Sequence, residues 1–180
     1  MLRLHPSVFA SAILALAPVA LHAQSAPNNV LSINPLSSIL GFYSGEFEHA
    51  LSPSTSIGIG GSYWSDDADN FGNGYRLRYY STEAKLRYYP SARGLAGFNL
   101  GLTGGITRVS EHHTTAGSID DGATAGSFGF EFAYNWLLGA DRRLLISAGG
   151  GAKRLILTSD NVDHTTLAYP TIRFSVGFAF

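Results

Sequence analysis

Bulky apolar residues alternate with small or polar residues along most of this chain. From Ser127 to Leu138, every even position holds Phe, Tyr, Trp or Leu and nearly every odd position holds a small or polar residue. Residues 171–180 repeat the pattern up to the end of the chain. A helix has a period of 3.6 and could not keep its two faces apart in this way. The pattern predicts β-strands with two unlike faces.

Five further segments show the same alternation, at residues 43–51, 56–63, 83–88, 98–106 and 144–153. In the segment that ends at Tyr88, the phase changes upstream, because Arg76 and Arg78 fall on the parity of the apolar residues. We interpret the change as a β-bulge near Tyr79 and Tyr80, or as an extension of the strand beyond a membrane.

The connections between these segments alternate between short and long. The short ones are Ser52–Ser54, Pro90–Gly94 and Gly139–Arg143, and the long polar ones are Ser65–Asn73, Ser110–Gly122 and Thr158–Thr165. Outer-membrane barrels have short periplasmic turns, longer outer loops and an even number of strands. Seven strands follow residue 40, so we expect an eighth at Val30–Asn34, turned by Pro35–Ser38. The sequence therefore predicts an all-β fold, an eight-stranded antiparallel up-and-down transmembrane β-barrel.

Composition indicates which face of the sheet points outward. Charged residues make up only 14% of the chain, aromatic residues make up 12%, and 21 of the 180 residues are glycine. A soluble barrel of the lipocalin kind would turn its apolar face inward, but the interior of eight strands is too narrow for this many rings. The opposite face of the strands, made of Gly, Ser, Asn and Ala, would also be a poor surface for a soluble protein. We expect the rings to face lipid.

This orientation places eight charged side chains inside the barrel, four acidic and four basic: Glu46, Glu48, Glu83, Lys85, Arg87, Glu131, Lys153 and Arg173. An unpaired charge in a narrow interior is costly, so we expect carboxylates paired with Arg and Lys. The pattern favours a lumen filled by salt bridges over an ion or proton path.

Aromatic residues are expected near both ends of the strands, as in the girdles of membrane barrels. Those assigned to the end with the short turns are Tyr43, Tyr88, Tyr89, Tyr134 and Trp136, and those assigned to the end with the long loops are Tyr63 and Trp64.

The N-terminus has the pattern of a secretory signal. Arg3 provides a positive start, Val8–Leu21 is apolar, and Ala23 ends a small-residue cleavage motif. We expect cleavage after Ala23, which divides the chain into a signal peptide at 1–23 and an outer-membrane barrel at 24–180. The alternative, an uncleaved anchor, is disfavoured because the apolar run is short for a span of about 20 residues.

The mature chain resembles the small eight-stranded outer-membrane barrels of the OmpA/OmpX type in length, strand count and loop asymmetry. The terminal residues look like the signal read by the outer-membrane assembly machinery in that group: Phe174, Val176, Phe178 and Phe180. Asn34–Leu36, Gly45–Leu51 and Arg87–Pro90 also resemble an uncharacterised family of outer-membrane barrels, which implies no activity.

Three arrangements could carry chemistry, and each is weak. An outer segment contains Ser110, Glu111, His112, His113, Asp120 and Asp121, which a lipid A-modifying hydrolase could use, but no family spacing of His and Ser is present. Asp66–Gly72 lacks an oxygen ligand at Phe71 and is a poor calcium loop. A metal site at His112, His113 and His164 would use adjacent His residues, which is poor ligand spacing.

The sequence favours a non-enzymatic outer-membrane barrel with a structural or surface-interaction role in a Gram-negative-type bacterium. The alternatives are a lipid A-modifying enzyme and a narrow channel. The chain has no cysteine and a net charge of -1, so we expect no thiolate metal site, no cofactor and no nucleic-acid partner. The expected partners are outer-membrane lipids, lipopolysaccharide, and periplasmic chaperones and the barrel-assembly machinery during biogenesis. We expect a monomer.

Overall fold

The fold is given by a computed structural model that describes residues 27–66, 75–113, 120–157 and 166–180. The predicted signal peptide, His164 and most of the predicted calcium loop, 67–72, lie outside the described residues. The elements are β1 (Asn29–Ile33), α1 (Pro35–Ile39), β2 (Tyr43–Ser52), β3 (Thr55–Asp66), β4 (Tyr75–Tyr88), β5 (Gly97–His113), β6 (Asp120–Leu138), β7 (Leu144–Leu157) and β8 (Thr166–Ala179).

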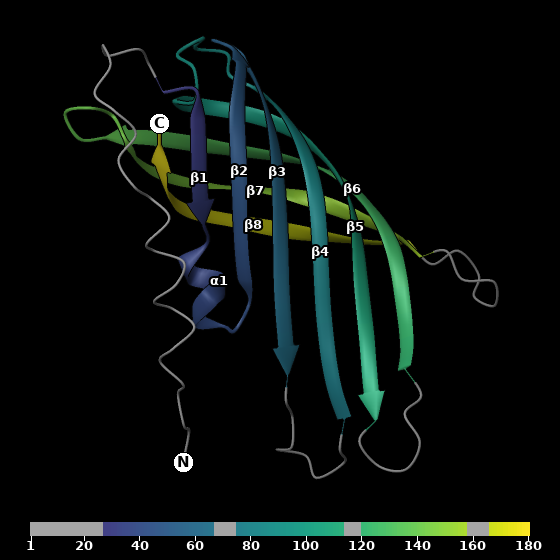
Figure 1. Cartoon of the computed structure of the whole chain (residues 1–180). Helices are drawn as coiled ribbons and strands as arrows, with labels where there is room; N and C mark the ends of the chain where they lie inside the picture. Colours follow the sequence, from purple (N-terminus) through teal and green to yellow (C-terminus); the bar gives the residue numbers. More distant parts are fainter. Residues whose placement is uncertain (1–26, 67–74, 114–119, 158–165) are drawn as a thin grey trace, which may run out of the picture.

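The strands form a closed barrel in which each pairs antiparallel with its neighbour in sequence (Figure 1). The barrel closes where β1 pairs with β8, from Val30–Ala179 to Ile33–Val176. Asn29 and Phe180 complete the closure, because the backbone N–H of each donates to the carbonyl of the other at 2.9 Å. The predicted fold class is confirmed, including the eighth strand near Val30.

The bulky face of the sheet points outward, as the composition indicated. Phe128, Phe130 and Phe132 on β6 are 51%, 55% and 46% exposed, whereas Glu131 and Ala133, on the other face of the strand, are buried. The same alternation runs along β4, where Ser81 and Arg87 are buried and Tyr80, Leu86 and other even positions are exposed. The rings therefore form the exterior of the barrel.

The β-bulge predicted near Tyr79 and Tyr80 is wrong. These residues pair with Trp64 and Tyr63 in an uninterrupted register between β3 and β4, and β4 pairs with β5 without a shift. The other interpretation was an extension of the strand beyond a membrane. The strand does extend, because β4 begins at Tyr75 and Arg78 lies on its outward parity.

The predicted loop Ser110–Gly122 is too long. β5 continues to His113 and β6 begins at Asp120, so Glu111 pairs with Asp121 and His112 with Asp120. Polar composition was read as a loop, but a strand that keeps its ladder of backbone hydrogen bonds tolerates polar side chains.

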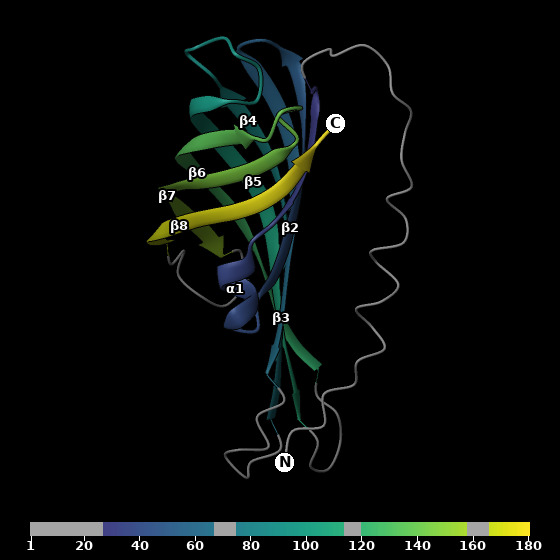
Figure 2. The ribbon, with the colours of Figure 1, turned by 90° about the vertical axis from the view of Figure 1, so that its left-hand side faces the viewer.

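A short helix, α1, replaces the turn expected at Pro35–Ser38 (Figure 2). Asn34 caps it by accepting a hydrogen bond from the Ser37 backbone N–H at 3.1 Å, and Pro35 occupies its first turn. Asn before Pro is a helix-start signal that could have been read from the sequence. No helix of the described residues has the length and apolar character needed to cross a bilayer.

Candidate functional site: the charged lumen

Arg87 is buried in the barrel interior, which we call the lumen. Its side chain is only 1% exposed and contacts three carboxylates from two other strands. Nη1 lies 2.6 Å from Glu46 and 2.5 Å from Glu48, and Nε lies 2.5 Å from Glu131. One guanidinium thus bridges β2 and β6 across the interior.

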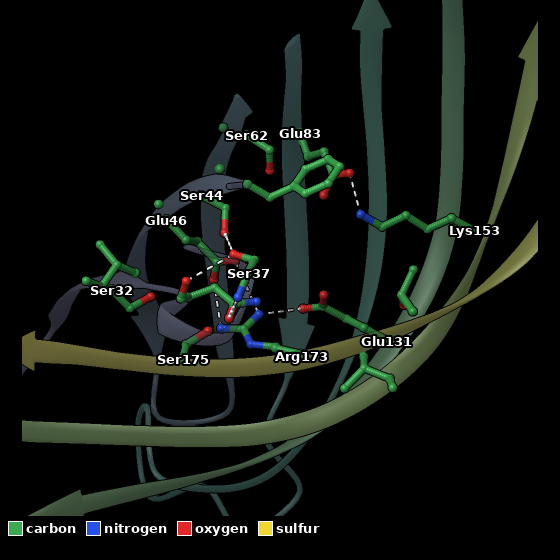
Figure 3. A pocket seen from close by; sticks show the side chains of 18 of the residues that line it. Ser32, Ser37, Ser44, Glu46, Ser62, Glu83, Glu131, Lys153, Arg173 and Ser175 are labelled. Atoms are coloured by element: carbon green, nitrogen blue, oxygen red, sulfur yellow. Dashed lines mark hydrogen bonds and ion pairs between the residues drawn. The ribbon is translucent and has the colours of Figure 1, made fainter. Parts of the chain in front are cut away.

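Glu46 joins Arg87 to two further cations. Its carboxylate lies 2.6 Å from Lys85 Nζ and 3.0 Å from Arg173 Nη2. Arg173 in turn reaches Glu131 at 3.2 Å, so the two carboxylates share it (Figure 3). These four side chains, Glu46, Lys85, Glu131 and Arg173, come from β2, β4, β6 and β8, and the closed barrel brings them into contact.

Glu83 and Lys153 form an ion pair on the side of the lumen toward β7 (Figure 3). Lys85 lies 3.9 Å from Glu83 and connects this pair to the rest. All eight charged residues proposed for the lumen therefore belong to one connected set of ion pairs, which we call the lumen network.

The lumen is sealed at the end with the short turns. Glu48 accepts hydrogen bonds from Ser56 Oγ at 2.5 Å and from the Tyr89 hydroxyl at 2.6 Å. Asn135 donates to the Tyr89 oxygen at 3.1 Å and to the Leu95 carbonyl at 3.0 Å. An apolar cluster closes the same end, made of Val30, Tyr89, Leu95, Leu145 and Ala179. Sequence reasoning missed this seal, because it is built partly from the turn after β4.

The other half of the lumen contains a cavity of about 640 Å³. The charged residues on its wall are Glu46, Glu83, Lys85, Glu131, Lys153 and Arg173. Five serines also line it: Ser32, Ser37, Ser44, Ser62 and Ser175. The Ser37 and Ser44 hydroxyls lie 3.2 Å apart (Figure 3). The lumen network is the floor of this cavity.

Three of the seven assignments to aromatic girdles are wrong. Tyr89 is buried inside the barrel. Tyr43 pairs with Tyr63, so it lies at the end opposite to the one predicted. Trp64 has the inward parity of β3, and its ring stacks on that of Phe42 at a distance of 5.2 Å. The Tyr79 ring lies 6.1 Å from the same Phe42 ring. The assignments followed the nearness of each ring to a turn or loop in the sequence, and not the parity of its strand.

The side chains of the described residues form no catalytic or metal-binding group. His112, His113, Asp120 and Asp121 lie on the paired ends of β5 and β6, but their side chains are outside the described part. Within the described residues, no group of three His, Asp or Glu side chains is arranged to hold a metal ion.

The residues proposed as an assembly signal lie on the outward parity of the last strand. Phe178 and Phe180 are 42% and 49% exposed and stack at 6.3 Å, and Phe174 and Val176 are half-buried. The Arg143 guanidinium lies 5.9 Å from the centre of the Phe178 ring.

Comparisons with known proteins give structural neighbours only. No family model and no curated protein matches the chain. The N-terminal β-barrel domain of Pseudomonas aeruginosa OprF is 12% identical, with 86% of this chain and 98% of that one covered and a TM-score of 0.49. Yersinia pestis Ail, crystallised with the heparin analogue sucrose octasulfate, is 11% identical, with 86% and 99% covered and a TM-score of 0.48. Acinetobacter baumannii CarO2 is 12% identical, with 86% and 98% covered and a TM-score of 0.39. At these identities and TM-scores the neighbours carry no argument about function. The eight-stranded fold itself follows from the strand pairing.

Proposed function

We propose that this chain is a non-enzymatic, integral outer-membrane β-barrel of a bacterium, with a structural or surface-interaction role. The observation that carries the proposal is the combination of an apolar exterior with a charged interior. Rings and aliphatic side chains are exposed around a closed sheet, while the ionised groups pair inside. In water this exterior would be a very large apolar patch, whereas in hydrocarbon it is the favourable surface.

We further propose that the lumen network blocks conduction. Arg87 and its three carboxylates cross the interior, and the apolar cluster around Leu95 lies between them and the short-turn end. An ion that followed this path would have to displace buried pairs. This supports a plugged barrel over a narrow channel.

Outward-facing arginines support lipopolysaccharide as a partner. Arg78 on β4 and Arg108 on β5 are exposed, and Arg108 pairs directly with Tyr80, two positions from Arg78. Both lie toward the long-loop end of the apolar exterior. Guanidinium groups bind phosphate with charge-assisted hydrogen bonds, so this position suits the phosphates of an outer leaflet.

The membrane assignment is tested with the mature protein refolded in detergent. We expect heat-modifiable migration on mildly denaturing gels and strand-rich circular dichroism. Recovery of the mature protein from the periplasm as a soluble species without detergent would contradict the proposal.

The conduction claim is tested by single-channel recording in planar bilayers. We expect no discrete conductance from the wild-type barrel, and conductance when Arg87→Ala, which removes the bridging guanidinium, is combined with Leu95→Ala, which opens the apolar cluster at the short-turn end. Steady wild-type channels would favour the narrow-channel alternative.

The lipopolysaccharide contact is tested with Arg78→Gln and Arg108→Gln in one chain, and with Arg93→Gln, a turn residue at the opposite end, as control. We expect the double variant to bind lipopolysaccharide more weakly and with a shallower salt dependence, because two phosphate contacts are lost. Equal binding by the double variant and the control would refute the contact.

The enzyme alternative is tested by mass spectrometry of lipid A. We expect the profile to be the same in cells with the wild-type gene, a deletion and His112→Ala with His113→Ala. A profile that changes with both the deletion and the substitutions would establish the enzyme instead.

A further inference from the structure

The wall of the barrel has a gap beyond the last residue of β1, on the side of the long loops. β7 pairs with β8 along nearly its whole length, from Leu144–Phe178 to Ile156–Thr166. On its other side, β8 pairs with β1 only as far as Ile33–Val176. In the described part of the chain, the rest of β8 is an edge strand between β7 and a gap. Pro170 lies in this stretch, which suits a residue that cannot donate to a neighbouring strand.

Helix α1 occupies the gap without closing it. It contacts β2 and β8 and has no buried residue. Its outer side chains, Leu36 and Ile39, are 51% and 79% exposed. Ser37 points toward Ser44 in the lumen (Figure 3). Backbone that is not paired into a sheet is tolerated at membrane depth only where it is buried in protein or lines a cavity.

The lining of the cavity extends to this gap. Its lining includes the inward-facing Arg173 and also Ile33 and Ile172, which have the outward parity of β1 and β8 and are 58% and 87% exposed. Residues of both parities of β8 therefore line the cavity where the wall is unpaired, so we infer that the lumen opens there to the exterior of the wall. That exterior is the surface that the proposed function places against lipid.

The chemistry of the cavity suits a ligand without net charge. Its three carboxylates and three cations belong to the lumen network, so neither sign is in excess. Among the described residues that line the cavity, Arg173 has a buried Nε without an acceptor, and the serine hydroxyls of the same wall suit a polar head group. Leu40, Phe42, Tyr79 and other apolar or aromatic residues of the upper wall suit a hydrocarbon chain. A volume of about 640 Å³ lies within the range of about 300–1,000 Å³ typical of ligand sites.

We propose that this cavity binds a single-chain amphiphile with a net-neutral head group, which enters sideways from the outer leaflet through the gap between α1 and β8. The head group lies on the lumen network near Arg173, and the chain lies toward Phe42 and Ile172. The inference rests on the proposed membrane location and adds a ligand site to it.

Two single-tryptophan variants test the site, because the chain has only two tryptophans. Trp136→Phe leaves Trp64, which stacks on the cavity residue Phe42, and Trp64→Phe leaves Trp136, which is 43% exposed on the exterior. Each is reconstituted in unbrominated bilayers. The probe is a zwitterionic lysophosphatidylcholine with a brominated acyl chain, whose bromines quench nearby tryptophan.

We expect Trp136 to be quenched in proportion to the probe in the bilayer, and Trp64 to be quenched with saturation and restored by the unbrominated lipid. Thr171→Phe, which fills the inward cavity wall, should abolish the saturable quenching of Trp64. The control Thr82→Phe, on the exposed face of β4, should leave it unchanged.

The two hypotheses fail in different ways. Absent quenching of Trp136 would overturn the membrane location. Quenched Trp136 with unquenched Trp64 would overturn the ligand site alone. Quenching of Trp64 that is linear in the probe and insensitive to Thr171→Phe would also overturn it, because it would come from lipid outside the wall.

Discussion

Replacing Arg87 by Met tests whether the lumen network stabilises the barrel. Methionine keeps much of the buried stem and removes the charge. Glu46 would keep Lys85 at 2.6 Å, and Glu131 would keep Arg173 at 3.2 Å. Glu48 would lose the one cation that contacts it among the described residues, retaining the Ser56 and Tyr89 hydroxyls.

The size of the effect follows from this asymmetry. Removal of one partner of a buried pair leaves an uncompensated charge and costs about 3–5 kcal/mol. We therefore expect Arg87→Met to lower the free energy of unfolding by that amount. Adding Glu48→Gln removes the stranded charge, so the double variant should recover a coupling energy of about 0.5–3 kcal/mol.

The assay is equilibrium unfolding by urea from lipid vesicles, followed by tryptophan emission. Arg93→Met, at an exposed position in a turn, is the matched control and should change the free energy of unfolding by less than about 0.5 kcal/mol. If Arg87→Met is as stable as the control, or if Glu48→Gln destabilises it further, the reasoning about the lumen network is refuted.

Two further pairs of substitutions test the packing of the interior and the orientation of the sheet. A Cβ at Gly101 would lie 2.9 Å from Glu131 Cγ, so Gly101→Ala should cost about 1–3 kcal/mol, whereas Gly126→Ala meets nothing within 4 Å and should be close to neutral. Urea unfolding of both variants measures this, and equal stabilities would contradict the packing. Phe130→Arg, in the middle of the outward face of β6, should cost about 2–4 kcal/mol in a bilayer, and Leu138→Arg, at the end of the strand, about 0–1 kcal/mol. The reverse order of the two costs would mean that the membrane does not surround this face.

Much of the fold was determined by the sequence alone. The alternation on β6 and β8 identified both faces, because side chains of a strand alternate regardless of its partners. The short segment at Val30 was sought because of the even-number rule and was then located by the alternation of Leu31 and Ile33 with Ser32 and Asn34. The eight lumen charges were found for the same reason, since each lies on the small-residue parity of its strand.

Only the tertiary structure decided which charges meet and where the wall is open. Arg173 and Glu46 are separated by 127 positions, and their contact depends on the stagger of all the strands around the barrel. Trp64 and Tyr89 were placed on the exterior by their neighbours in sequence, yet both point inward. The gap between α1 and β8 exists because β1 ends at Ile33 while β8 continues. Alternation is a local property of a chain, whereas strand length, register and closure depend on partners that are distant in sequence.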